Sequence, residues 1–245
     1  MPRLPPLPPL LAMILLIAAN NAAARTPFEA RCEARQLGLD TDTRRPGVSV
    51  DARDAGYRVD NSLSYRTLTQ MKRERAGDYV LGLTRAESRV SISVEGAIVA
   101  DPDTGEECML PRIGVRLSYL PVVIYVGSEF APGTCPYREI LAHEMRHLKA
   151  YADYLPKVES RVRTVLGRRF DGRSMYAPRG QALARVQAEL DGRWMPFIKG
   201  EMGKAKALQA RIDSPGEYAR LSKVCQGEVQ SLIGSTRRSR SSTSS

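Results

Sequence analysis

Short stretches of alternating apolar and polar residues fill the first half of the chain, and they are rich in branched and aromatic side chains. This alternation is typical of half-buried β-strands, because successive side chains point to opposite faces of a sheet. Five short strands are predicted, at residues 57–59, 79–83, 90–94, 113–119 and 122–126. A helix is predicted among them at residues 62–75. The first half of the chain should therefore form a sheet.

The second half of the chain has a helical pattern. Residues 136–155 contain no glycine and no internal proline, and apolar residues recur at helical spacing, at Ile140, Leu141, Leu148, Ala152 and Leu155. Thr134 or Cys135 would cap the start of this helix, with Pro136 at its first position, where a missing N–H costs nothing. Pro156 is expected to end it.

A basic stretch at residues 157–173 and long helical material from residue 180 towards residue 212 follow the first helix. The predicted fold class is α+β: an N-terminal, mostly antiparallel sheet, then a central helix and long C-terminal helices. The chain has 245 residues, of which 42% are hydrophobic and 26% charged, as in ordinary globular proteins. We expect one folded domain over residues 25–233.

The two ends of the chain have compositions of their own. Arg3 precedes an apolar run at residues 10–19, and alanines follow up to Ala24, which predicts a signal peptide over residues 1–24. The run is too short to span a bilayer, and no later segment approaches the roughly 20 apolar residues that a membrane-spanning helix needs. Residues 234–245, rich in serine and arginine, are expected to be disordered. The protein should be exported, to the periplasm or the medium, and should not span a membrane.

The net charge of +10 could attract anionic partners. Aromatic residues make up only 6% of the chain, and no nucleic-acid-binding module is recognisable, so nucleic acid is not expected. Most of these charges are expected to form an ordinary solvated surface, and anionic polymers of the cell envelope are the charged partner that the excess could attract.

Four cysteines fit an exported protein, because disulfides persist outside the cytoplasm and an even number permits complete pairing. We expect Cys108 to pair with Cys135, which would tie the segment before the last strands to the start of the helix. Cys32 would then pair with Cys225. A four-cysteine zinc site is the alternative, but no CxxC pair is present.

Both histidines of the chain lie in one pentapeptide, His143-Glu144-Met145-Arg146-His147. On a helix, residues i and i+4 lie on the same face, so two imidazoles can bind one zinc ion while the intervening Glu144 reaches a metal-bound water as general base. This is the HExxH signature of zinc peptidases. The alternative is an ordinary polar pair on a surface helix, which the apolar neighbours of the motif make less favourable.

A third protein ligand must be a carboxylate, because no further histidine exists. Asp153 has the spacing of HExxHxxGxxD, but Ala150 takes the place of the glycine that lets the chain leave the helix. On an unbroken helix Asp153 would point about 80° away from His143 and should miss the metal. Glu189, on a following helix, is another candidate, although its charged neighbours also fit a solvated helical face.

The chain resembles a family of bacterial exported proteins described as candidate zinc-dependent proteases. The resemblance begins at Tyr57 and includes Thr84, Cys108, residues 115–117, Pro121 and the segment 141–147. It continues downstream, where the family has a glutamine and, four residues later, an aspartate; Gln209 and Asp213 match that pattern. This chain has Ile212 where the family often has tyrosine, and it lacks the threonine and histidine that often follow.

The resemblance implies that Asp213 is the third zinc ligand. The residues around it permit another interpretation, because Ser214, Pro215 and Glu217 have the form of a capping box. Asp213 would then only precede the start of a helix.

These observations together predict an exported zinc metallopeptidase of the zincin type, acting on a peptide or protein substrate. The zinc ion would be held by His143, His147 and Asp213, with Glu144 as catalytic base. Residues 122–126 are either the strand that lines the substrate cleft or an ordinary core strand. Four side chains are candidates for a donor to the oxyanion of the reaction: Arg146, Tyr151, Tyr154 and Tyr218. The alternative function is a non-catalytic envelope-binding protein that retains the motif helix.

Overall fold

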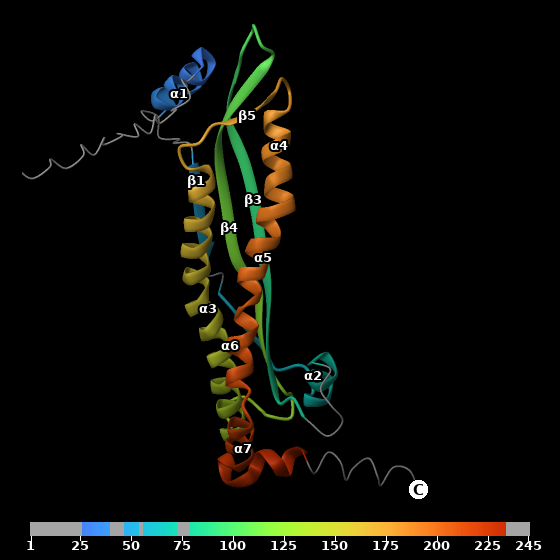
Figure 1. Cartoon of the computed structure of the whole chain (residues 1–245). Helices are drawn as coiled ribbons and strands as arrows, with labels where there is room; N and C mark the ends of the chain where they lie inside the picture. The colour runs from blue at the N-terminus through green and yellow to red at the C-terminus, as the bar shows by residue number, and fades with distance from the viewer. Residues whose placement is uncertain (1–25, 40–46, 54–55, 73–78, 234–245) are drawn as a thin grey trace, which may run out of the picture.

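A pair of long antiparallel strands runs the length of the protein (Figure 1). The computed structural model describes residues 26–39, 47–53, 56–72 and 79–233, so the expected signal peptide and C-terminal tail lie outside the described residues. Strands β3 (Gly82–Ala100) and β4 (Glu106–Val126) form this pair, with a register shift between Ala86 and Ser88. Four of the short strands predicted from the sequence merge into these two.

Strand β4 lies at the centre of a mixed sheet. One edge of β4 pairs with β3, and the other pairs in turn with three short strands: β5 (Met175–Pro178), β1 (Gly47–Arg53) and β2 (Arg58–Asp60). β1 and β2 run parallel to β4, so the sheet is mixed, whereas the sequence predicted a mostly antiparallel one. β1 and β5 were not predicted from the sequence, because they contribute few apolar positions and are held mainly by pairing with β4.

Helix α3 (Cys135–Phe170) carries the two histidines and is longer than predicted. Thr134 caps its start, as expected, and accepts a hydrogen bond from the backbone N–H of Tyr137. The expected end at Pro156 is wrong, because that proline lies inside the helix. Its ring is exposed, so the backbone carbonyl that loses a partner faces solvent, while buried residues on the opposite side continue the apolar stripe to Phe170: Leu155, Val158, Val162 and Leu166.

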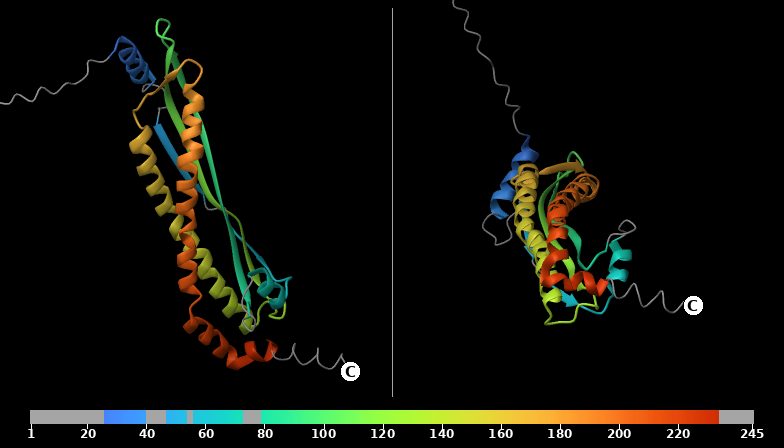
Figure 2. Two further views of the ribbon diagram at one scale, coloured as in Figure 1. Left: turned by 45° about the vertical axis from the view of Figure 1, so that its right-hand side comes forward. Right: turned by 90° about the horizontal axis from the view of Figure 1, so that it is seen from below.

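A second column of helices returns along the same face of the sheet, beside α3 (Figures 1 and 2). It consists of α4 (Ala182–Glu189), a π-helical turn (Leu190–Trp194), α5 (Met195–Gly203) and α6 (Ala205–Ile212). The main core lies between these two columns and the sheet, and it includes Val115, Leu117, Val162, Leu166, Val186, Leu190 and Ile198. The protein is thus an elongated two-layer structure.

Short helices cover the two ends of the molecule (Figure 1). α1 (Pro27–Leu39) lies near β5 and the far end of the β3–β4 pair, whereas α2 (Tyr65–Lys72) lies at the other end, near the start of β3. α7 (Pro215–Lys223) follows α6 and crosses that second end, and a 3-10 turn (Val224–Gly227) comes after it. Residues 228–233 form a last short helix.

Two disulfides join these end pieces to the body of the protein, and their pairing differs from the expectation. Cys32 of α1 pairs with Cys108 of β4, and Cys135 of α3 pairs with Cys225 after α7. The expected Cys108–Cys135 bond is wrong because β4 is one long strand. About 18 residues of it, or roughly 60 Å, separate Cys108 from the end that leads to α3.

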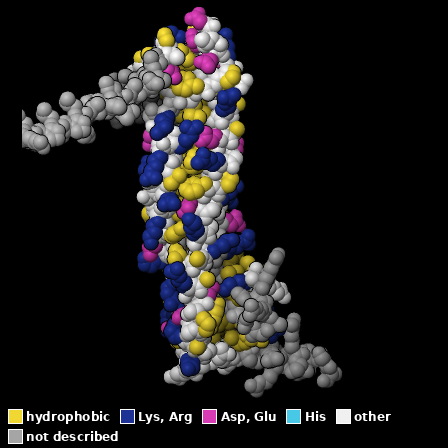
Figure 3. Space-filling view, in the orientation of Figure 1, with side chains coloured by type: hydrophobic (Ala, Val, Ile, Leu, Met, Phe, Trp, Pro, Cys, Tyr) yellow, Lys and Arg dark blue, Asp and Glu magenta, His cyan; other side chains and the backbone are white. Residues whose placement is uncertain are grey.

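The surface of the helical face is basic along its length. Figure 3 shows Lys and Arg side chains spread over both helical columns rather than gathered in one patch. Within the described residues, no helix combines the length and the apolar character needed to cross a membrane.

Candidate metal centre

A cavity of about 570 Å³ lies where the start of β3 meets α2, α3, α6 and α7. His143, Glu144, His147 and Asp213 lie in its wall. Most of the remaining lining is apolar and includes Leu81, Leu83, Ile140, Tyr218 and Leu221. The motif helix therefore presents its polar residues to a partly open, largely apolar cavity.

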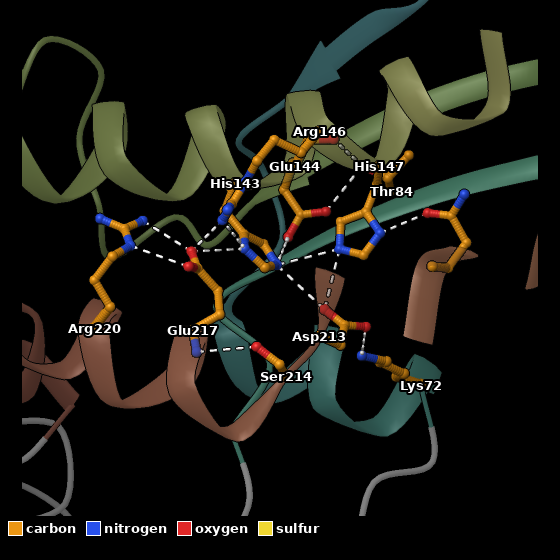
Figure 4. A network of polar contacts seen from close by, with 11 residues as sticks. Lys72, Thr84, His143, Glu144, Arg146, His147, Asp213, Ser214, Glu217 and Arg220 are labelled. Carbon is orange, nitrogen blue, oxygen red and sulfur yellow. Dashed lines mark hydrogen bonds and ion pairs between the residues drawn. The ribbon is translucent and has the colours of Figure 1, made fainter. Parts of the chain in front are cut away.

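The two histidines are buried one helical turn apart on α3, and their Nε2 atoms lie 3.2 Å from each other. Oδ1 of Asp213 lies 3.2 Å from Nε2 of His143 and 3.1 Å from Nε2 of His147 (Figure 4). Three possible ligand atoms thus form a nearly equilateral triangle. Glu144 also lies within reach of a shared ion, but its Oε1 is farther away, 4.0 Å from Nε2 of His143.

Asp213 reaches the histidines because the chain turns between α6 and α7. It is the last residue of the α6 hydrogen-bonding pattern, donating its backbone N–H to the carbonyl of Gln209, and Ser214 then caps α7. Ser214 thus forms the expected N-cap, but the expected capping box is incomplete. The backbone N–H of Ser214 donates to the carbonyl of Ile212, and the carboxylate of Glu217 turns to His143 instead. Asp213 faces both histidines as well. Its second oxygen, Oδ2, accepts a hydrogen bond of 3.0 Å from Nζ of Lys72 on α2.

Each histidine has a polar neighbour at its other ring nitrogen. Nδ1 of His147 lies 2.6 Å from the amide oxygen of Gln209 on α6. Nδ1 of His143 lies 3.2 Å from Oε1 of Glu217 on α7. Arg146 pairs with the same carboxylate oxygen, and its Nη2 lies 2.9 Å from Nδ1 of His143. α6 and α7 therefore hold both imidazoles from the side away from Asp213.

Glu144 is buried between α3 and the start of β3, with 3% of its surface exposed. The hydroxyl of Thr84 on β3 donates to Oε2 of Glu144 over 2.8 Å. Burial raises the pKa of the Glu144 carboxyl, and this outweighs the opposing influence of the two histidines and Thr84.

The charged groups of the site shift one another's pKa values. Burial alone would raise the pKa of Asp213, but hydrogen bonds from His143, His147 and Lys72 hold it well below its usual range. Burial alone would lower the pKa of His147, yet Asp213, Glu144 and Gln209 together raise it. Hydrogen bonds from Arg220 above all, and from Arg146 and His143, lower the pKa of Glu217 to about 2. Asp213 and Glu217 therefore stay ionised, and Asp213 places a negative charge beside the Nε2 atoms of both histidines.

The other carboxylates considered from the sequence lie elsewhere. Glu189 forms a two-pronged ion pair with Arg169 and accepts a hydrogen bond from the indole of Trp194. Asp153 is exposed and pairs with Lys149. Neither carboxylate is a neighbour of the histidines.

The strand beside the site is also different from the one considered. Residues 122–126 belong to the buried centre of the sheet, between β2 and β3, so the core-strand alternative is the correct one. Residues 81–84, at the start of β3, line the cavity instead.

Among the candidate oxyanion donors, Tyr151 and Tyr218 line the cavity. Tyr154 packs against the main core, and Arg146 is engaged by Glu217. Lys72, Gly82 and the contact of Glu217 with His143 were not predicted from the sequence. Lys72 and Gly82 carry no local signal, whereas Glu217 was recognised only as part of a capping box.

No protein-family model matches this chain, and neither the curated proteins nor the solved structures contain a significant match to it. The residues of the site are therefore the basis for assigning a function.

Proposed function

We propose that the protein is an exported zinc-dependent peptidase of the zincin type, in which His143, His147 and Asp213 hold the zinc ion and Glu144 is the general base. The observation that carries this proposal is the triangle formed by the two Nε2 atoms and Oδ1 of Asp213, with sides of 3.1 to 3.2 Å. The two disulfides fit an exported protein, since such bonds persist in oxidising compartments.

The size of the triangle suits zinc. Tetrahedral ligands at about 2.0–2.1 Å from zinc lie about 3.3–3.4 Å from one another, close to the separations here. Two histidines, one carboxylate and an open fourth position also form a common ligand set of catalytic zinc sites. Glu144 is left out of this set because its carboxylate lies farther from the imidazoles and is hydrogen-bonded by Thr84.

The outer neighbours of the histidines support metal binding through Nε2. An amide oxygen only accepts hydrogen bonds, so Gln209 holds a proton on Nδ1 of His147, and Nε2 is the nitrogen that would give up its proton and bind a metal ion. At His143, Glu217 favours a proton on Nδ1, whereas Arg146 favours its absence. A metal ion on Nε2 would require the proton on Nδ1, which Glu217 would accept, and Arg146 would then pair with Glu217 alone.

Glu144 and the cavity supply the remaining chemistry. A bound zinc ion would activate a water molecule and stabilise the negative charge that develops on the peptide carbonyl. The carboxylate of Glu144 takes the proton of that water as the water oxygen bonds to the carbonyl carbon. It then gives the proton to the amide nitrogen as the C–N bond breaks. Burial raises the pKa of Glu144, which makes its carboxylate a stronger proton acceptor, and the apolar walls suit a peptide side chain.

The proposal is tested by zinc analysis and by the substitution Glu144→Gln in the purified mature protein. We expect about one zinc ion per chain in both proteins. Hydrolysis of a broad peptide library should fall about 10²- to 10⁴-fold in Glu144→Gln, because an amide cannot accept the proton of the water. Glu159→Gln, on the same helix but paired with Arg163 outside the site, is the matched control and should cleave normally.

The absence of zinc from the wild type would refute the proposal, as would equal cleavage by wild type and Glu144→Gln once contaminating proteases are excluded. Zinc without cleavage would favour the envelope-binding alternative. In that case, removal of Arg237, Arg238 and Arg240 should weaken attachment to anionic polymer in a salt-dependent manner.

A further inference from the structure

Thr84 makes a specific contact with the proposed base from a different part of the fold. Its hydroxyl lies on β3, 60 residues before Glu144, and is 2.8 Å from Oε2 and 3.0 Å from the backbone carbonyl oxygen of that glutamate (Figure 4). A hydroxyl has a single proton to donate, and an ionised carboxylate is a stronger acceptor than a peptide carbonyl. The main hydrogen bond therefore goes to Oε2.

Gly82, two residues before Thr84 on the same strand, also packs closely against the glutamate. A Cβ atom added to this glycine would lie 2.8 Å from both Cγ and Oε1 of Glu144 and 2.7 Å from Cγ2 of Ile140. β3 thus contacts the carboxylate of Glu144 with the hydroxyl of Thr84 and with Gly82, whose missing side chain leaves room for it. Thr84 holds Oε2 of the carboxylate, and Oε1 is the oxygen 4.0 Å from Nε2 of His143.

We propose that Thr84 is a positioning residue for Glu144: its hydroxyl holds Oε2 so that Oε1 faces the reacting water. This inference rests on the base role proposed above for Glu144. Thr84 itself exchanges no proton with the substrate. Its O–H stays on Oε2 while Oε1 takes the proton from water and later releases it to the leaving amine, so the carboxyl group keeps its orientation in both steps.

A purely structural role would be different. The contact with the backbone carbonyl of Glu144 could serve only to join β3 to α3, and its loss would then change stability without changing the chemical step. Thr84→Val separates the two roles, because valine keeps the branched shape and removes the hydroxyl, whereas Thr84→Ser keeps the hydroxyl. Thr164→Val is the matched control, because the Thr164 hydroxyl donates to the carbonyl of Ser160 on the exposed side of α3.

The experiment measures zinc content, kcat and KM for the zinc-loaded proteins. Thr84→Val should retain zinc and a nearly normal KM, with kcat lowered about 10- to 100-fold, a part of the typical contribution of a general base. Thr84→Ser should restore most of the rate, and Thr164→Val should match the wild type. In a Glu144→Gln background, Thr84→Val should cause little further loss, because residues that act as a unit are not additive.

A structural readout tests the same inference without activity. Crystal structures of the metal-free wild type and Thr84→Val should differ in the carboxylate of Glu144, which should move by more than about 0.5 Å in the variant, beyond the tolerance of a catalytic geometry. A carboxylate in the same place, or an active wild type whose kcat is unchanged by Thr84→Val, would overturn the inference alone. Equal losses in Thr84→Val and Thr84→Ser would also overturn it. A wild type without hydrolytic activity would overturn the proposed function, and the catalytic role of Thr84 with it.

Discussion

Nδ1 of His147 lies 2.6 Å from Oε1 of Gln209, although 62 residues separate the two in sequence. The contact joins α3 to the last turn of α6, which Asp213 directly follows. Gln209 therefore orients the imidazole through one hydrogen bond, and it belongs to the same helical end that delivers the third candidate ligand.

We predict that Gln209→Leu weakens zinc binding about 10- to 100-fold, the usual cost of losing an outer partner of a metal-bound histidine. Gln209→Glu should keep or strengthen zinc binding, because a carboxylate still accepts the hydrogen bond. It also removes the amide nitrogen Nε2, which is buried without a partner within the described part of the chain. Titration against a competing chelator measures both affinities. Gln187→Leu, at a site on α4 where the amide contacts Asp191, is the control, and equal affinities in all variants would contradict the prediction.

Asp213 should bind the zinc ion directly rather than only lie beside the histidines that bind it. We predict that Asp213→Asn weakens zinc binding by more than about 100-fold, beyond the loss expected for an outer partner. His143→Ala and His147→Ala should also lose the metal. Asp153→Asn is the matched control, because that exposed carboxylate pairs only with Lys149 among the contacts described. Zinc binding by Asp213→Asn at wild-type affinity would remove Asp213 from the ligand set.

Gly82→Ala should disturb the base without removing any ligand. Because a new Cβ would lie within 2.8 Å of Glu144 and 2.7 Å of Ile140, we predict a loss of about 1–3 kcal/mol in the free energy of unfolding. We also predict at least about a 10-fold lower kcat with zinc retained. Thermal unfolding and steady-state kinetics measure the two effects. Gly200→Ala in α5, where a Cβ meets nothing within 4 Å, should be neutral or stabilising; a similar result for Gly82→Ala would contradict the close packing.

The two disulfides should affect the proposed zinc site differently. Mass mapping of the non-reduced protein should yield the pairs Cys32–Cys108 and Cys135–Cys225, without free thiols among these four. Removal of either bond by alanine substitution should cost about 2–4 kcal/mol of stability. Only the Cys135–Cys225 variant should also weaken zinc binding, because that bond fastens the segment after α7, and α7 carries Glu217 to His143. Equal zinc affinity in the two double variants would contradict this link.

The sequence by itself determined the local parts of the site. The spacing of His143 and His147 puts them on one face of a helix whatever the fold, because the helical period alone decides it. Thr134 and Ser214 were likewise identifiable as helix caps, since a cap depends on hydrogen bonds within three residues. The family resemblance inferred from the sequence pointed to Gln209 and Asp213, but the spacing between them and the histidines could not show that they meet.

Only the tertiary structure decided which distant residues complete the site. The choice of Asp213 over Glu189 depends on where α6 ends along α3, and the contacts of Thr84, Gly82 and Glu144 depend on the register of β3 against that helix. The cysteine pairing follows from the uninterrupted length of β4, which separates Cys108 from Cys135. These outcomes come from packing and pairing between segments far apart in the chain, which no local pattern encodes, whereas helix period and capping act over a few residues.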